Sequence, residues 1–250
     1  MKLTELQQAI KKVLKTNKTV RVVSFKVGDK KYWLKQTEQP RGFMRLLKPN
    51  PKSALKHEVG VLQYLNKMAA PCAVLVAYDE DYLVLKDIGK TVNQWMRDAT
   101  VDELQKKAIL NDCALALAEL HQLDLVHGRP AIRDMGWHNG KVRFIDFESK
   151  LNIQRLQWNK IRDLLIFIHD LYRNNLSAEM IESAVSQYRQ YDYPAGGEQV
   201  WQASVAFIYK CRFLYTLFKP FYPIAGKDLL ASLKLFEYLL FEHSRKEPET

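Results

Sequence analysis

Long apolar runs are missing from this chain of 250 residues. No stretch approaches the roughly 18 consecutive apolar residues that a helix needs to cross a bilayer, so no transmembrane segment is predicted. The first residues are polar and periodic, which does not fit a secretory signal. Cysteines are few, and Cys72, Cys113 and Cys211 lack the spacing of a metal site. Three scattered thiols indicate reduced cysteines in a cytoplasmic protein rather than a disulfide framework.

Acidic residues are scarce in the first quarter of the chain. Residues 1–60 hold fifteen Lys and Arg but only four Asp and Glu, whereas the other 190 residues hold 23 and 24. The whole basic excess therefore lies at the N-terminal end. It indicates an anionic partner, such as a phosphate-rich lipid or a nucleotide, or simply a basic surface that aids solubility. Nucleic acid is not expected, because no known reader motif accompanies the charge.

The first third of the sequence predicts a small β-rich unit. Thr4 and Gln7 have the spacing of a capping box, and they open a basic amphipathic helix. That helix either lies on an acidic membrane surface or packs on its own domain. The remaining elements are a β-hairpin turned at Gly28-Asp29, a helix capped by Ser53 and a second hairpin, over residues 20–35, 53–65 and 73–85.

The rest of the sequence is mostly helical in pattern. A connector over residues 86–89 leads to a long helix, and later an Asn139-Gly140 turn predicts a short hairpin. Helices are expected over residues 101–123, 159–172, 177–190, 199–218 and 226–241. This order predicts an α+β protein of two lobes: a small β-rich N-lobe with one main helix over residues 1–86, and a helical C-lobe over residues 87–250.

Two segments of the predicted C-lobe carry closely spaced polar and charged residues. The first runs from His127 through Gly128 and Arg129 to Asp134, and the second contains Asp146 in Phe144-Ile-Asp-Phe-Glu148. Phosphoryl transfer needs the triphosphate held in place and its charge neutralised. Two carboxylates brought together by a hairpin suit Mg²⁺. In the predicted N-lobe, Lys35 could contact phosphates and Glu58 could hold that lysine.

From about residue 20 to about residue 172 the sequence resembles the lipopolysaccharide-kinase branch of the protein-kinase-like fold, which acts on inner-core sugars. More distantly it is similar to RIO-type atypical kinases and to aminoglycoside phosphotransferases. The resemblance implies ATP and Mg²⁺ as cofactors. It matches Lys35 to the phosphate-binding lysine and Glu58 to its helix partner. It also places adenine against the backbone of Lys86 and Ile88.

In the C-lobe the resemblance assigns Mg²⁺ to Asp134 and Asp146, and it assigns support of the loop backbone to Asp163. Three departures stand out. No glycine-rich phosphate loop precedes Lys35, Arg129 replaces the acidic residue that normally orients the acceptor hydroxyl, and Asp134 replaces an asparagine. An arginine cannot act as a general base at neutral pH, but it can stabilise transferring phosphate charge or bind a phosphorylated acceptor.

The candidate catalytic residues are therefore Asp134, Arg129 and His127, with His127 expected chiefly to brace the loop. The leading hypothesis is a cytoplasmic, ATP- and Mg²⁺-dependent phosphotransferase that acts on a hydroxyl of a lipopolysaccharide inner-core sugar. Its acceptor would be an anionic glycolipid or a phosphorylated sugar, and its basic N-terminal region would touch the inner membrane. An atypical protein kinase and a pseudokinase that binds nucleotide or a partner stay open. The sequence does not predict an oligomeric state.

Overall fold

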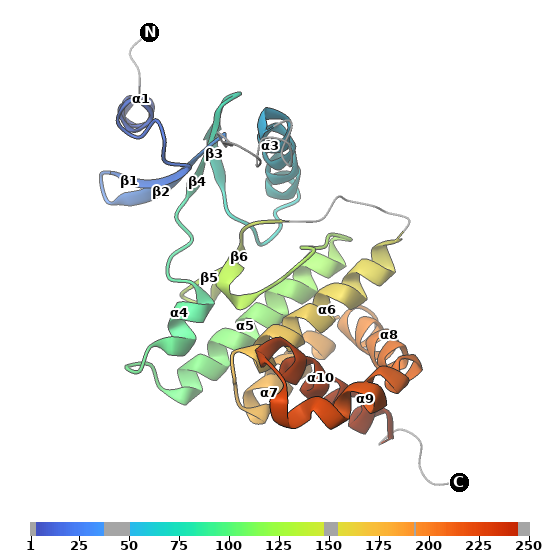
Figure 1. Ribbon diagram of the computed structural model, residues 1–250. Helices are drawn as coiled ribbons and strands as arrows, with labels where there is room; N and C mark the ends of the chain where they lie inside the picture. The colour runs from blue at the N-terminus through green and yellow to red at the C-terminus, as the bar shows by residue number, and fades with distance from the viewer. Residues whose placement is uncertain (1–3, 38–50, 148–154, 193, 245–250) are drawn as a thin grey trace. The chain divides into compact units, whose positions relative to one another are not determined.

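The computed structural model describes residues 4–37, 51–147, 155–192 and 194–244. It contains two compact units, Met1–Gly89 and Lys90–Thr250 (Figure 1). This division falls three residues beyond the predicted boundary at Lys86. Asp87 belongs with the first unit, because its backbone N–H donates to the carbonyl of Lys31 at 3.0 Å and its carboxylate accepts from the indole N–H of Trp33.

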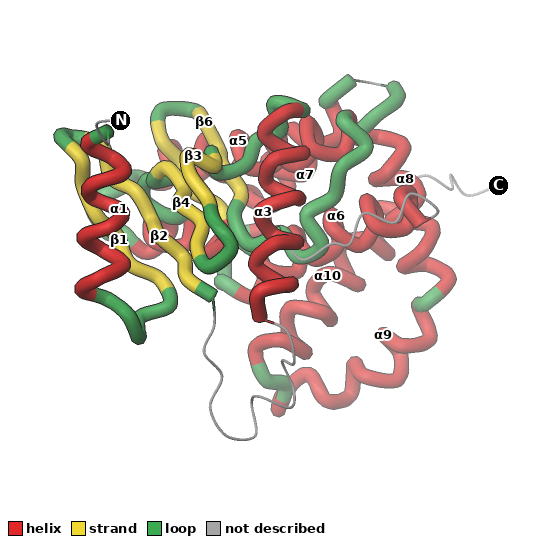
Figure 2. Tube along the Cα trace, turned by 90° about the horizontal axis from the view of Figure 1, so that it is seen from above, coloured by secondary structure: helices red, strands yellow, loops and turns green. Residues whose placement is uncertain are grey.

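A four-stranded antiparallel sheet forms the centre of the first unit, in the order β1-β2-β4-β3. Its strands are β1 (Val22–Val27), β2 (Lys30–Gln36), β3 (Leu75–Tyr78) and β4 (Tyr82–Lys86). The helices α1 (Glu5–Thr16) and α3 (Pro51–Lys67) lie on opposite sides of this sheet (Figure 2). Neighbouring residues of β4 point to opposite faces, so Val84 packs with α1 while Leu83 packs with α3.

Helix α1 packs against its own sheet, one of the two roles left open for it. Ile10 is only 3% exposed and clusters with Leu34 and Val84. The expected capping box is present, since the Thr4 hydroxyl accepts from the N–H of Gln7 and the Gln7 side chain accepts from Thr4. Because its apolar stripe is covered, only the exposed basic face of α1 is left for an anionic surface.

The second unit is helical around one large core. Its first helices are α4 (Val92–Arg97) and α5 (Glu103–Gln122), followed by the 3₁₀ turn η1 (Ile132–Asp134) and the hairpin β5 (Met135–His138) and β6 (Lys141–Phe144). The helices α6 (Leu156–Arg173), α7 (Ala178–Gln190), α8 (Gly197–Lys210) and α10 (Lys227–Ser244) complete that core. Helix α9 (Arg212–Phe218) and the 3₁₀ segment η3 (Lys219–Ile224) contain no buried residue.

Three local features differ from what the sequence predicted. No helix was predicted over residues 92–97, yet Thr91 and Gln94 form a capping box that begins the short helix α4. The helix predicted over residues 199–218 is two helices, α8 and α9, separated at Cys211. Helix α3 begins at Pro51, so Ser53 lies inside its first turn and is not the N-cap. Proline has no N–H to lose and its φ angle suits a first helical turn, which explains the earlier start.

Among the described residues, no helix combines the length and the apolarity needed to cross a bilayer.

Candidate functional site

The predicted lysine–glutamate pair forms in the first unit. Lys35 Nζ lies 2.6 Å from Glu58 Oε1, and the two side chains are 16% and 30% exposed. The register of the sheet explains the contact. Lys35 is paired with Leu83, whose side chain packs against α3, so both residues point to the face on which Glu58 lies. A half-buried lysine held by a carboxylate is a pre-positioned cation for a phosphate.

The segment expected to hold adenine is tied to the sheet. The amide of Lys86 donates to the carbonyl of Val74 at 2.9 Å, so a contact between Lys86 and adenine would use the carbonyl of Lys86 instead. Ile88 is half-buried, and next to it the N–H of Gly89 donates to Asp87 Oδ2 at 3.1 Å. The role of Lys86 and Ile88 in nucleotide binding stays a prediction.

In the second unit the carboxylate of Asp163 on α6 holds the loop that carries the candidate catalytic residues. Asp163 is fully buried, and it accepts from the backbone N–H of His127 at 2.6 Å and of Gly128 at 2.9 Å. The φ angle of Gly128 is +98°, a conformation that favours glycine because a Cβ would be strained there. Two charge-assisted bonds from one buried carboxylate fix the loop's entry, as the resemblance implied for Asp163.

His127 forms the bracing contact that the sequence predicted. Its Nδ1 accepts from the N–H of Arg129 at 3.3 Å, so the proton lies on Nε2, which donates to the carbonyl of Ile145 at 2.8 Å. The ring is fully buried and lies against Phe147, with 4.7 Å between ring centroids. With both nitrogens engaged, His127 links the loop to the strand end that precedes Asp146 and is poorly placed to move a proton.

Asp170 is a second support of the loop that sequence reasoning missed. Its Oδ2 accepts from the N–H of Ile132 at 2.9 Å. Asp170 lies seven residues after Asp163, two helical turns along the same face of α6. That spacing was visible in the sequence, but only Asp163 was given a supporting role. Helix α6 therefore anchors the loop at both ends.

Asp134 and Asp146 are brought together by the hairpin β5–β6. Met135 pairs with Phe144, and the N–H of Ile145 donates to the carbonyl of Asp134 at 2.9 Å. Burial raises the pKa of the Asp134 carboxyl and the charge of Asp146 raises it further, while Arg133 opposes both. The φ angle of Asp146 is +61°, a left-handed conformation that aspartate adopts more readily than most residues. Two carboxylates are thus held close enough to repel one another.

Such a pair has the donor chemistry of a Mg²⁺ site. Magnesium is commonly held by one or two carboxylates together with substrate phosphates and water. No cluster of three or more His, Cys, Asp or Glu suited to a metal occurs in the described parts of the chain, so a structural metal centre of protein ligands alone is not indicated there. The mutual repulsion of Asp134 and Asp146 would be relieved by a bound cation. Glu148, weighed as a further ligand, lies outside the described residues.

Arg129 and Arg133 bring positive charge to the same loop. Arg129 is half-buried, and its carbonyl accepts from the N–H of Ala131 at 2.9 Å. Arg133, which sequence reasoning did not single out, is exposed and its Nε lies 3.4 Å from Asp134 Oδ2. Its signal in the sequence was only its position beside Asp134. The catalytic role of Arg129 stays a prediction.

The chain is similar to known proteins over most of its length. The family model described as the phosphotransferase enzyme family (APH) matches residues 19–190, a span that contains Lys35, Glu58, Asp134 and Asp146. A protein of Haemophilus influenzae is 39% identical over 238 residues, which cover 95% of this chain and 97% of the relative.

Two solved structures are similar at the level of the whole chain. One is a streptomycin–ATP–APH(2″)-IIa ternary complex, with 14% identity, a TM-score of 0.45 and coverage of 94% of this chain and 99% of that one. The other is a gentamicin–APH(2″)-IIa complex, with 15% identity, a TM-score of 0.47 and coverage of 96% and 97%. The element order, a small antiparallel sheet with its helix followed by a helical unit, is that of the kinase-like fold predicted from the sequence. The chain belongs to the phosphotransferase enzyme family.

Proposed function

We propose that the protein is an ATP- and Mg²⁺-dependent phosphotransferase that works in the cytoplasm on a hydroxyl of an anionic glycolipid, with a lipopolysaccharide inner-core sugar as its acceptor. The observation that carries the proposal is the Asp134–Asp146 pair, held beside a loop that the buried Asp163 fixes in place. Family membership supports phosphoryl transfer. The basic excess of the first 60 residues supports an anionic acceptor.

Each residue has a distinct part in the proposed reaction. Lys35, held by Glu58, would neutralise phosphate charge. Asp134 and Asp146 would hold Mg²⁺, which supplies further charge neutralisation when bound. Arg129 would stabilise the charge of the group in transit or of a phosphorylated acceptor. Proton removal from the acceptor is late in a loose transition state, so the absence of an acidic residue at position 129 does not prevent the reaction.

ADP release in the presence of inner-core glycolipid tests the proposed site. Lys35→Ala and Asp146→Asn should each lower turnover at least about 10²-fold, because each removes charge stabilisation of the transition state. Lys30→Ala is the matched control on the same strand, since Lys30 is exposed. Asp124→Asn is the matched control for Asp146, because it has the same left-handed backbone, with φ +55°, at an exposed position. Equal turnover in the site variants and their controls would refute the assignment.

A nucleotide-binding pseudokinase is the second candidate, and the observation that favours it is Arg129 at the position of the acceptor-orienting acid. Such a protein would be stabilised by ATP and Mg²⁺ in a thermal unfolding experiment and would release no ADP. Arg129→Asp separates the two functions. A gain of ATP hydrolysis would identify a degenerate loop, whereas a loss of transfer would show that Arg129 works in the native reaction.

A further inference from the structure

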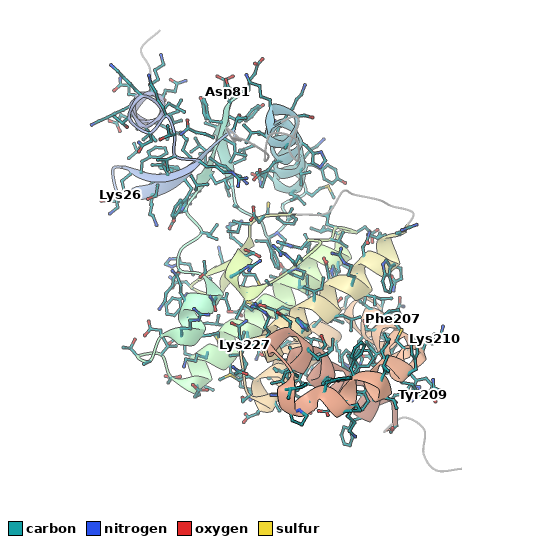
Figure 3. All side chains as sticks on the ribbon, in the orientation of Figure 1. Lys26, Asp81, Phe207, Tyr209, Lys210 and Lys227 are labelled. Carbon is teal, nitrogen blue, oxygen red and sulfur yellow. The ribbon has the colours of Figure 1, made fainter. Side chains whose placement is uncertain are left out.

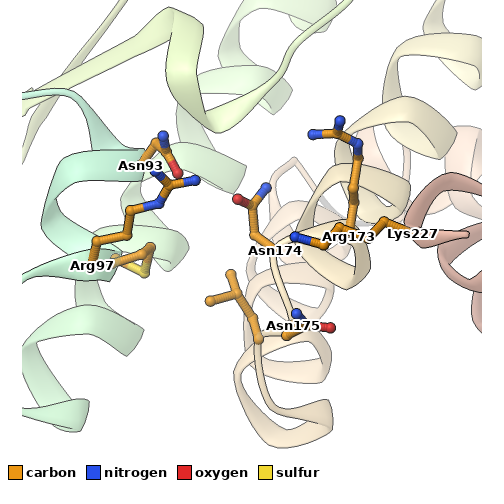
Figure 4. Close-up of a pocket in the computed structure, with 8 residues that line it drawn as sticks. Asn93, Arg97, Arg173, Asn174, Asn175 and Lys227 are labelled. Atoms are coloured by element: carbon orange, nitrogen blue, oxygen red, sulfur yellow. The ribbon is translucent and has the colours of Figure 1, made fainter.

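A polar hollow of about 410 Å³ lies in the second unit (Figure 4). Its walls come from α4, from the end of α6 with the residues that follow it, and from the first residue of α10. Three basic residues and three asparagines line it together with Met96 and Leu176: Arg97, Arg173, Lys227, Asn93, Asn174 and Asn175. Its volume is within the usual range for small-molecule sites.

The charge of the hollow is positive. No acidic residue lines it, although Asp228 Oδ1 lies 2.5 Å from Arg173 Nε and the charge of Asp170 also acts on Arg173. Within the described ranges, no carboxylate lies within 4 Å of the charged groups of Arg97 and Lys227. The charges of Arg97 and Lys227 therefore favour an anion, and two arginines can present paired N–H groups to a phosphate.

The side chain of Asn93 indicates that the ligand carries a hydrogen-bond donor in addition to its negative charge. Its Oδ1 is buried and has no hydrogen-bond partner in the part of the chain that the structure describes. A buried acceptor without a donor is costly, so a ligand that supplies a donor is favoured there. The surrounding cations disfavour an amine, and a hydroxyl is therefore the fitting donor. An anion that also carries hydroxyl groups is a phosphorylated sugar.

The hollow borders the candidate catalytic loop. Helix α4 packs against η1, whose last residue is Asp134. On the other wall, Asp170 of α6 holds the N–H of Ile132, one helical turn before Arg173. Both walls thus contact the segment that carries Asp134. Resting on the proposed function, we propose that this hollow is the acceptor site and that it binds a phosphate group of a phosphorylated sugar.

Calorimetric titration without ATP tests the site separately from catalysis. Glucose 6-phosphate is the probe, with glucose and inorganic phosphate for comparison. The wild type should bind glucose 6-phosphate more tightly than phosphate and should not bind glucose. The double variant R97Q/K227Q should weaken binding at least about tenfold, because it removes two charge-assisted contacts. Asn93→Leu should remove the preference for the sugar phosphate over phosphate. R162Q/K141Q, with two exposed charges removed elsewhere in the same unit, is the control.

Two outcomes would overturn the proposal: binding of glucose 6-phosphate that R97Q/K227Q leaves unchanged, or no binding of either anion by the wild type. Phosphoryl transfer to glycolipid with an unchanged KM in R97Q/K227Q would also overturn the site while leaving the proposed function in place. Conversely, binding that depends on Arg97 and Lys227 without any transfer would leave the site in place and refute the function. Repeating the titration with the phosphorylated core glycolipid in micelles distinguishes a lipid-linked sugar from a soluble one.

A second, independent observation concerns α9 and η3, whose large apolar side chains face solvent. Phe213 is 63% exposed, Leu217 59% and Ile224 80%, and Phe218 and Phe221 are also exposed. Several large exposed apolar side chains within one short segment indicate an interaction site. The segment begins beside Lys210, which Figure 3 labels at the end of α8.

The charges in this segment select one kind of partner. Lys210, Arg212 and Lys219 are interleaved with the aromatic residues, and residues 209–224 contain no Asp or Glu. Aromatic and apolar side chains with flanking lysines are typical of helices that lie in the interface of an anionic bilayer. Surfaces that bind proteins are instead depleted in lysine. We infer that α9 and η3 form a contact surface for anionic lipid.

Flotation with vesicles tests this surface. The wild type should bind vesicles of phosphatidylglycerol mixed with phosphatidylcholine, and binding should fall with added salt. Phe213→Ser with Phe221→Ser should lower binding about tenfold or more, because two apolar side chains no longer enter the bilayer. Their exposure allows both variants to fold, and an unchanged thermal midpoint checks this. Lys11→Gln with Lys12→Gln on α1 is the control for general basic charge.

Vesicle binding that is absent in the wild type, or unchanged in the double serine variant, would refute the inference. A wild type that self-associates and ignores vesicles, with self-association lost in the double serine variant, would assign the surface to a second copy of the chain.

Discussion

At the scale of single residues, the site depends on carboxylates with different environments. Asp163 is fully buried and accepts hydrogen bonds from two backbone N–H groups, so its role is to hold the loop in place. Asp134 is 13% exposed in its side chain and repelled by Asp146, and we propose that it binds a cation. The same residue type would thus support the loop in one place and bind a ligand in another, depending on what surrounds it.

Replacing Asp163 with Asn should destabilise the protein. The amide nitrogen of asparagine cannot accept, so one of the N–H groups of His127 and Gly128 would lose its partner, and the charge assistance of both bonds would be lost. The cost should be about 3 kcal/mol, which lowers the thermal midpoint by roughly 10 °C for a chain of this size. Asp124→Asn, at an exposed site, should change the midpoint little. An unaltered midpoint in Asp163→Asn would contradict the role of this carboxylate.

Asp134→Asn should have the opposite effect on stability. Because burial and Asp146 raise the pKa of Asp134 in the folded state, its ionised form destabilises that state at neutral pH, and folding is favoured as the pH falls. Removing the charge should stabilise the metal-free protein by about 1 kcal/mol. Thermal unfolding with and without Mg²⁺ and ATP checks this. Adding Mg²⁺ and ATP should raise the thermal midpoint of the wild type, and it should raise that of the variant by less. An equal gain in both proteins would exclude Asp134 as a metal ligand.

At the scale of elements, the sequence was most informative where a local pattern determines the structure. The capping box at Thr4, the Asn139-Gly140 turn and the helical pattern over residues 177–190 correspond to α1, to the β5–β6 hairpin and to α7. It was least informative about α4, whose six residues are too few to show a helical period. The break at Cys211 was also missed, because the apolar pattern continues across it while the side chains of α9 turn out to face solvent.

A buried polar junction joins α5, α6 and α7 and should give the protein a pH-dependent stability. His121 is buried, its Nδ1 lies 2.6 Å from the hydroxyl of Tyr188, and its Nε2 lies 3.6 Å from Asp163 Oδ2. Burial lowers the pKa of His121 below its ordinary value, although Asp163 opposes this shift. The unfolded chain therefore binds a proton at this residue more readily than the folded one, and stability should fall as the pH drops below about 6.5.

Urea unfolding between about pH 5 and pH 7.5 measures this effect. The free energy of unfolding should decline toward the acid end in the wild type, and His121→Gln should flatten that decline. His243→Gln at the end of α10 is the comparison variant. A slope that persists in His121→Gln would place its origin elsewhere.

At the scale of the whole molecule, the sequence could predict those site residues that belong to a local sequence motif. Lys35, Glu58, Asp146 and Asp163 lie in recognisable local patterns, and the structure gives the first two a contact and the last a clear support role. The hollow lined by Arg97, Arg173 and Lys227 could not be predicted, since its residues lie on three elements far apart in the chain and only folding brings them together. The exposed aromatic surface was equally hidden, because a helical apolar pattern suggests burial.

The structure also changes the interpretation of how basic residues are distributed along the chain. The N-terminal basic excess suggested a membrane contact through α1, but the apolar stripe of that helix packs on its own sheet. The second unit has almost balanced charge, yet it concentrates cations in one hollow and in one aromatic surface. An anionic, lipid-linked sugar is the acceptor that would use both features, with its phosphate in the hollow and its lipid in a bilayer that α9 and η3 touch.

The most direct test of the proposed activity is the fate of the γ-phosphate of labelled ATP. Wild-type protein, Mg²⁺ and purified inner-core glycolipid should yield labelled glycolipid, with no label on a protein substrate offered in parallel, and Lys35→Ala should yield none. Label on the protein substrate alone would identify a protein kinase. Bound ATP that leaves its label on neither acceptor would contradict the account and would favour the pseudokinase.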